Sequence, residues 1–200
     1  NKINSLPELP PNLKILDISS NEFEDYPESV NKLSNLLQLD LSYNKLKNLP
    51  ESINNLKSVK KINISSNYLT YVDINLQNLR TLNLRYNDIT EIHLHDSNIE
   101  NLYLTNNNIS NIADPLTQMK AVDLQQNPVT QLNMLSHNLA SLTLSKAKLT
   151  SLPTVILSFS KLEKLELSKN ALRELPVAIN TLTNLKDLSI HHYTPFIFIH

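Results

Sequence analysis

A short apolar motif recurs along the chain and constrains its fold more than any other feature of the sequence. The motif reads LxxLxLxxNxL, as in LLQLDLSYNKL from Leu36 and LRTLNLRYNDI from Leu79. About nine units begin at Leu13, Leu36, Val59, Leu79, Ile99, Met119, Leu139, Leu162 and Leu185, and they are numbered here one to nine. Self-similarity at a period of roughly 20–50 residues indicates a solenoid, in which each unit buries its apolar side chains against its neighbours.

The central part of each unit predicts a short strand with one buried face. In LxLx the side chains alternate, so that Leu39 and Leu41 point to one side and the intervening polar residue points to the other. An asparagine follows the strand and is expected to hydrogen-bond backbone groups that the turn leaves unpaired. This predicted asparagine ladder consists of Asn21, Asn44, Asn67, Asn87, Asn107, Asn127 and Asn170. Ala147 takes the equivalent place in unit seven, so the ladder should be interrupted there.

Unit length predicts what lies on the side opposite the strands. Successive units start 23, 23, 20, 20, 20, 20, 23 and 23 residues apart, so the outer units are longer than the central ones. The long units contain a proline, as in LPESINNLKS from Leu49, and proline presets the entry into a short turn or helix. The short units, such as VDINLQN from Val72, have room only for extended or 3-10 backbone. We therefore expect little regular helix.

The repeats identify the chain as resembling leucine-rich repeat proteins. That resemblance implies an α/β solenoid curved like a horseshoe, with a parallel sheet on its concave face and extended, 3-10 or short helical segments on its convex face. It covers residues 1–200, which we interpret as a single domain with incomplete first and last units. The segment LPELPPNL from Leu6 resembles the corresponding junction of leucine-rich repeat effectors that pathogenic bacteria inject into host cells, whereas the long units resemble plainer 23-residue repeats.

Composition excludes several classes of function. Lys and Arg number 18 against 19 Asp and Glu, without a run of like charge, which argues against nucleic-acid binding. No run of about 18 apolar residues is present, so membrane insertion is not predicted. The chain has no glycine and no cysteine, which removes Walker loops, dinucleotide turns, nucleophile elbows and thiolate sites. The chain's 28 asparagines are expected to take over the turns, because asparagine tolerates left-handed backbone.

Function is expected to reside in the variable residues that face outward from the strands. Tyr43, Arg85, Tyr86 and Tyr103 are the strongest candidates for contacting a partner, because aromatic residues and arginine dominate interface energies. The competing interpretation is that they are scattered surface side chains. A small basic patch of Lys60, Lys61 and Arg80 favours an acidic partner surface, although a solvated edge fits it equally well.

Catalysis and metal binding are not predicted. His93 and His95 project from one convex segment, and no third ligand is apparent beside them, so neither a metal nor another cofactor is expected. The sequence instead predicts a protein-protein interaction module that binds a partner on its concave face. The alternative is the substrate-recognition part of a larger enzyme, such as an effector ubiquitin ligase whose catalytic domain is absent from the chain.

The remaining expectations concern the setting of the chain. We expect a monomer that binds a host or bacterial protein, located in the cytoplasm or secreted by a bacterium into a host cell. Asn1 already occupies the ladder position of an incomplete unit, and the apolar run Phe196–Ile199 resembles a capping segment or the start of another turn. Both features favour a fragment of a longer chain.

Overall fold

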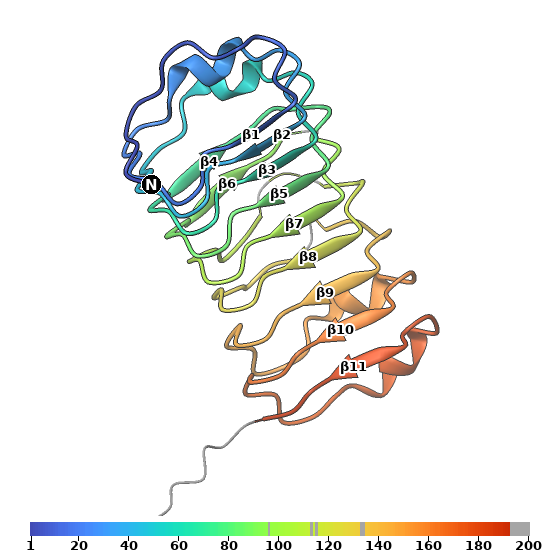
Figure 1. Cartoon of the computed structure of the whole chain (residues 1–200). Coiled ribbons are helices and arrows are strands. Elements are labelled where there is room, and N and C mark those ends of the chain that lie inside the picture. The colour runs from blue at the N-terminus through green and yellow to red at the C-terminus, as the bar shows by residue number, and fades with distance from the viewer. Residues whose placement is uncertain (96, 113, 115, 133–134, 193–200) are drawn as a thin grey trace, which may run out of the picture.

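The computed structural model describes residues 1–95, 97–112, 114, 116–132 and 135–192, and the run Phe196–Ile199 lies outside them. One three-residue strand per unit joins a nine-stranded parallel sheet whose order follows the sequence (Figure 1). Its strands are β1 (Ile15–Asp17), β2 (Gln38–Asp40), β3 (Lys61–Asn63), β5 (Thr81–Asn83), β7 (Asn101–Tyr103), β8 (Ala121–Asp123), β9 (Ser141–Thr143), β10 (Lys164–Glu166) and β11 (Asp187–Ser189). The exposed side of this sheet, predicted as the concave face, is called the sheet face below.

The strands pair in step, so equivalent residues of successive units stack in columns. Leu39 pairs with Ile62 and Ile62 with Leu82, while Asp40 pairs with Asn63 on the other side of the same strands. The apolar column lies inside the solenoid and the polar column lies on the sheet face, as the alternation LxLx predicts. A residue's position in its unit therefore fixes which neighbours it meets.

The back of the solenoid, opposite the sheet, differs between long and short units. The 23-residue units carry 3-10 helices η1 (Glu28–Lys32), η2 (Glu51–Asn55), η3 (Thr154–Ser158) and η4 (Val177–Thr181), each directly after a proline. Two of the 20-residue units carry extended segments instead, β4 (Tyr71–Asp73) and β6 (Glu91–His93), which pair as a second parallel sheet. The described residues form no α-helix, and they include no helix long and apolar enough to cross a membrane. The predicted solenoid fold is confirmed.

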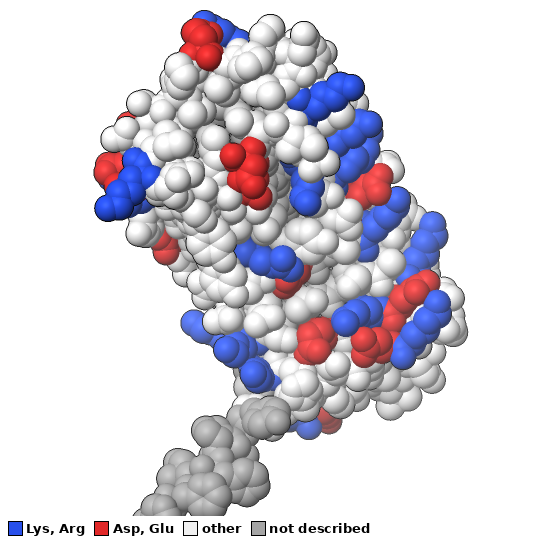
Figure 2. All heavy atoms as spheres, in the orientation of Figure 1, with Lys and Arg blue, Asp and Glu red and all other residues white. Residues whose placement is uncertain are grey.

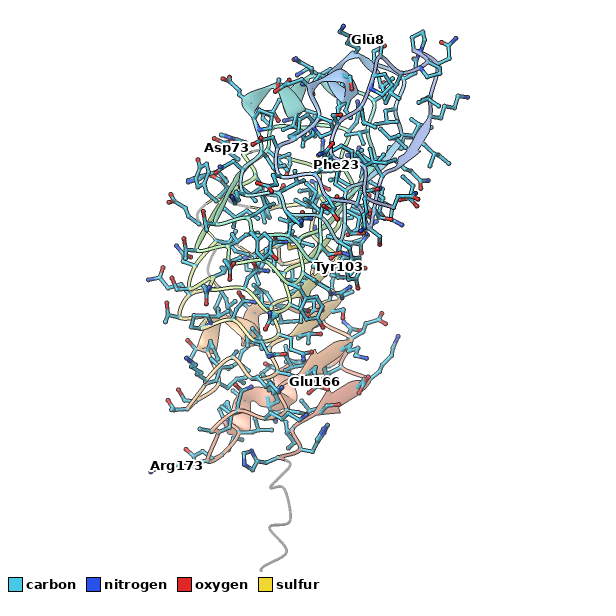
Figure 3. The ribbon with its side chains drawn as sticks, turned by 60° about the vertical axis from the view of Figure 1, so that its left-hand side comes forward. Glu8, Phe23, Asp73, Tyr103, Glu166 and Arg173 are labelled. Carbon is cyan, nitrogen blue, oxygen red and sulfur yellow. The ribbon has the colours of Figure 1, made fainter. Side chains whose placement is uncertain are left out.

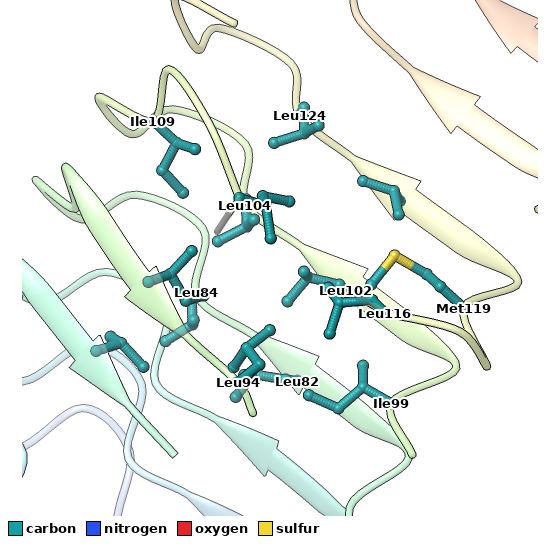
Figure 4. Packing of buried hydrophobic residues seen from close by; sticks show 14 of the residues in the cluster. Leu82, Leu84, Leu94, Ile99, Leu102, Leu104, Ile109, Leu116, Met119 and Leu124 are labelled. Carbon is teal, nitrogen blue, oxygen red and sulfur yellow. The ribbon is translucent and has the colours of Figure 1, made fainter. Parts of the chain in front are cut away.

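The core is a continuous stack of aliphatic side chains between the sheet and the back. Figure 4 shows Leu82, Leu84 and Leu102 packed against Leu94 and Leu116 from the back of the coils. All five are almost completely buried. Each buried leucine contributes about 1.5–3 kcal/mol, and a single coil cannot cover its own leucines, so stability depends on stacking.

The ladder asparagines lie on the edge of the solenoid where the strands end, called the ladder edge below. From Asn44 to Asn127 and again at Asn170, each Nδ2 donates to the carbonyl three residues earlier and to a carbonyl of the preceding coil. Their Oδ1 atoms accept backbone N–H groups of the preceding coil. Asn21 makes the corresponding bonds to Ile18 and Ile3. The ladder thus joins neighbouring coils as well as closing each turn.

The left-handed residue of each turn was wrongly expected to be asparagine. It is the residue just before the ladder position, and it has φ between 54° and 60° in eight units: Ser20, Tyr43, Ser66, Tyr86, Asn106, Gln126, Lys146 and Lys169. Only Asn106 among these is an asparagine. The ladder asparagines are selected for their amides, and the surrounding hydrogen bonds hold the preceding residue in the strained region whatever its type.

Candidate protein-binding surface

A row of polar side chains along the sheet face forms hydrogen bonds with the chain's own backbone. In six units the side chain of the last strand residue accepts a hydrogen bond of 2.8–3.2 Å from the backbone N–H two residues later. The pairs are Asp17–Ser19, Asp40–Ser42, Asn63–Ser65, Asn83–Arg85, Asp123–Gln125 and Glu166–Ser168. Sequence reasoning treated this column as freely variable, although its recurrent Asp-x-Ser and Asn-x-Ser pattern signals such local turns.

Arg85 and Tyr103, two of the predicted contact residues, lie together on the sheet face. The Arg85 guanidinium carbon is 4.3 Å from the centre of the Tyr103 ring, and Arg85 Nη2 donates to Asp123 Oδ2 at 2.8 Å. Thr105 Oγ1 donates to the same Asp123 oxygen at 2.7 Å and lies 3.3 Å from Arg85 Nε. The arginine is therefore held by residues of the two following units, those of β7 and β8. Asp123 and Thr105 were missed from sequence because they lie two units and one unit away.

Tyr43 and Tyr86, the other two predicted contact residues, lie on the ladder edge and not on the strands. They occupy the left-handed turn positions of units two and four, and their exposed fractions are 63% and 52%. Tyr68 of unit three, 55% exposed, lies on the same edge between these coils and was missed from sequence. Tyr43, Tyr68 and Tyr86 together are called the tyrosine edge. The signal for Tyr68 was its place two residues beyond the left-handed position, which is exposed or half-buried in units one to eight.

The three basic residues of the predicted patch lie where the strands begin. Arg80 Nη1 donates to the carbonyls of Gln77 and Leu79, and its Nε lies 3.8 Å from a carboxylate oxygen of Glu100. Lys60 and Lys61 have no ion pair with any residue that the structure describes. The net positive charge of the patch is therefore concentrated on these two lysines, on the opposite edge of the sheet from the tyrosine edge.

The histidines on the back take part in local pairs. His95 Nε2 lies 2.7 Å from Asp73, and His93 Nε2 lies 2.8 Å from Glu91. The hydrogen bond with Glu91 raises the pKa of His93, against the opposing effect of burial. Asp73 lies at the left in Figure 3, well away from Tyr103 of the sheet face. No group of three metal-ligating side chains suited to a metal ion occurs among the described residues.

A serine-histidine pair occurs at the C-terminal end of the sheet. Ser168 Oγ lies 2.9 Å from His191 Nδ1, and Glu166 accepts the backbone N–H of Ser168. Ser168 is buried, so a substrate carbonyl cannot reach its hydroxyl oxygen. The pair therefore joins units eight and nine and gives no support for nucleophilic catalysis.

Comparisons with known proteins agree with the repeats. Family models described as leucine rich repeat match residues 11–69 and 75–91. No curated protein sequence matches the chain. A leucine-rich repeat protein of Leptospira interrogans is 30% identical over 96% of this chain and 53% of its own length, with a TM-score of 0.85. This chain thus spans about half the length of that protein.

Two further bacterial structures are similar. YopM from Yersinia enterocolitica is 27% identical over 96% of this chain and 41% of its own, with a TM-score of 0.73. The functional domain of InlJ from Listeria monocytogenes is 25% identical over 89% of this chain and 39% of its own, also with a TM-score of 0.73. The stacked coils, the asparagine ladder, the family models and these structures together show that the chain is a leucine-rich repeat protein resembling those of bacteria.

Proposed function

We propose that the chain is a protein-interaction module that binds a partner protein through the tyrosine edge and the adjoining sheet face around Arg85 and Tyr103. The observation that carries this proposal is the exposure of three tyrosines on three consecutive coils. None of their hydroxyls has a hydrogen-bond partner among the described residues, whereas the buried Tyr26 donates to Asn31 at 3.0 Å. Stability of the fold gives no reason for tyrosine at these places, and exposed tyrosine is typical of interface hot spots.

The geometry suits a protein better than a small molecule. Nine strands at about 4.8 Å spacing make a face roughly 40 Å long, enough for a partner footprint of about 800 Å². Arg85 is already ordered by Asp123, Thr105 and the Tyr103 ring, so little side-chain entropy is lost when a partner packs on it. A rigid arginine-tyrosine pair beside exposed tyrosines supplies both polar and apolar contacts.

A role in a bacterium that delivers proteins into host cells is also part of this proposal. It is supported by the resemblance of LPELPPNL to the junction of bacterial effectors and by the likeness to three bacterial leucine-rich repeat proteins. The partner would then be a host protein. A translocation reporter fused to the full-length protein tests this setting, and failure of the fusion to enter host cells contradicts it.

The binding proposal is tested by capture with matched variants. The triple variant Tyr43→Ala, Tyr68→Ala, Tyr86→Ala should lose the partner that the unaltered chain captures from host lysate, with at least about a hundredfold weaker Kd if two of the tyrosines are hot spots. Tyr71→Ala is the control, because Tyr71 is 43% exposed but lies on the back. Equal capture by the triple variant, with an unchanged unfolding midpoint, would remove the proposal.

A further inference from the structure

Three lysines gather on the C-terminal half of the ladder edge. Lys146, Lys148 and Lys169 lie in the loops that follow β9 and β10, and all three are exposed. In Figure 2, blue side chains gather at the lower left beside the ends of β9 and β10, with no red among them. These three residues are called the lysine edge. The same edge of the solenoid thus presents tyrosines in units two to four and lysines in units seven and eight.

The charges of Lys146 and Lys148 are not neutralised by ion pairs, as the charges of several other lysines are. Three examples of lysines paired with carboxylates of neighbouring coils are Lys45 with Glu22 at 3.5 Å, Lys120 with Glu100 at 2.7 Å and Lys164 with Asp187 at 3.3 Å. Lys146 and Lys148 have no such partner among the residues that the structure describes. Two ammonium groups that are two residues apart in the sequence and have no counter-charge leave a local positive potential available to a ligand.

The carboxylate of Glu166 forms hydrogen bonds with the serines that precede two of these lysines. Glu166 accepts the backbone N–H of Ser168 at 2.8 Å and the hydroxyl of Ser145 at 2.9 Å. These serines directly precede Lys169 and Lys146 in the sequence. Glu166 Oε1 is therefore occupied by hydrogen bonds, and no ion pair joins Glu166 to Lys146 or Lys148 among the described residues.

The backbone holds Lys146 and Lys148 in fixed positions. Both have left-handed φ, 55° and 61°, with the buried Ala147 between them. The N–H groups of Ala147 and Leu149 both donate to Asn170 Oδ1, at 2.9 and 3.1 Å. The fold does not require lysine at position 146, because serine, tyrosine, asparagine and glutamine occupy the same turn position in other units. Lysine gains nothing from left-handed backbone, so its presence points to a use of the charge.

We propose that the lysine edge binds an Asp- or Glu-rich segment of the partner protein that packs on the tyrosine edge. This inference rests on the proposed function and adds the chemistry of the partner. Tyr86 and Lys146 lie in units four and seven, about 15 Å apart at strand spacing, which an extended segment of about five residues spans. A protein ligand accounts for both the tyrosines and the lysines. Nucleic acid fits less well, because its affinity comes from many phosphate contacts and this chain carries a net charge of −1.

The test measures binding of a labelled eight-residue glutamate peptide by fluorescence anisotropy, with an eight-residue glutamine peptide as the neutral probe. The unaltered chain should bind only the glutamate peptide, with affinity that falls as salt rises. Lys146→Glu, Lys148→Glu should weaken this binding at least about tenfold. The matched control is Lys14→Glu, Lys57→Glu, which makes the same change in net charge at two exposed lysines outside the lysine edge and outside the patch of Lys60, Lys61 and Arg80, and it should change binding less than about twofold.

Several outcomes overturn the inference. Equal losses in the two lysine variants would mean that only net charge is sensed, and tighter binding of a short DNA duplex than of the peptide would assign the site to nucleic acid. If the Lys146 and Lys148 variant keeps its peptide affinity while the tyrosine triple variant loses its captured partner, the inference fails and the proposed function stands. If the lysine variant loses the peptide while the tyrosine variant keeps its partner, the tyrosine part of the proposed function fails.

Discussion

Unit four has an asparagine, Asn87, at the ladder position, whereas unit seven has Ala147 there. The backbone hydrogen bonds of the two turns differ as a result. In unit four, Asn87 Nδ2 donates to the carbonyls of Ile64 and Leu84, both at 3.0 Å, and Oδ1 accepts the Leu69 N–H at 3.0 Å. In unit seven, Ala147 can make none of these bonds. The backbone N–H of Val129, which an asparagine there would bind, donates instead to Asn127 O at 2.9 Å.

This difference shows that core packing holds the coils together, whereas the asparagine ladder orders the loops at their edge. Core packing continues through unit seven, where Leu142 and Leu144 are as buried as Leu82 and Leu84. The edge does not continue unchanged, because Lys148 becomes a second left-handed residue and Asn170 takes the N–H groups of Ala147 and Leu149. The leucine stack therefore sets the fold, while the ladder determines the shape and stiffness of the loops that carry exposed side chains.

A second gap in the asparagine ladder should have the largest effect on stability. Asn87→Ala should lower the free energy of unfolding by about 3 kcal/mol, because Asn87 is only 4% exposed and three buried backbone groups lose a partner. Urea unfolding followed by circular dichroism measures the change. Asn108→Ala is the control, since the Asn108 side chain is exposed and should contribute less than about 0.5 kcal/mol. Equal stability of the two variants would show that the ladder contributes nothing beyond the core.

The ladder and its gap could be predicted from the sequence because both depend on local pattern. An asparagine at a fixed place after an apolar strand has one geometric role, and Ala147 lacks the atoms for it. The division between long and short units was predictable for the same reason: three extra residues after a proline are enough for a 3-10 turn. Each of these features is set within one unit and repeated by stacking.

The candidate site was less predictable because it depends on which units become neighbours and on the edge that each side chain occupies. Arg85 meets Asp123 across two strand spacings, a contact that no single unit contains. Tyr43 and Tyr86 were grouped with Tyr103, yet they lie on the ladder edge, because the left-handed turn takes them off the strand. Contacts between side chains of different units follow from the strand register, and the sequence predicts that register only once the solenoid fold is known.

The converse experiment closes the natural gap. Ala147→Asn should raise the free energy of unfolding by about 1 kcal/mol, the usual net value of added hydrogen bonds, because an amide there can bind Val129 N–H and the Leu124 and Leu144 carbonyls. The gain is smaller than the loss at Asn87 because the present turn already pairs Val129 N–H with Asn127 O. Slower amide exchange at Val129 should accompany it. Loss of stability would mean that the pocket around Ala147 has closed too far to admit the larger side chain.

The smallest expected effect concerns a titratable link beside the gap. Glu166 Oε1 accepts the Ser145 hydroxyl, so a carboxylate joins unit seven, which has the ladder gap, to unit eight. Burial opposes ionisation of Glu166, but hydrogen bonds from Ser168 and Ser145 outweigh it and lower its pKa below the ordinary 4.5.

The pKa of Glu166 is lower in the folded chain than in the unfolded chain. The ionised carboxylate therefore stabilises the fold above pH 4.5, and this stabilisation is lost as the pH falls through the folded-state pKa. Glu166→Gln cannot titrate, so the Tm difference between the unaltered chain and the variant should shrink steadily as pH is lowered from 6 towards 3. Asn170→Ala is the control, because Asn170 joins the same two units with an amide that does not titrate. The Tm difference between the unaltered chain and this variant should stay constant over the same pH range. A Glu166→Gln difference that also stays constant would mean that the carboxylate links the coils no better than a neutral acceptor does.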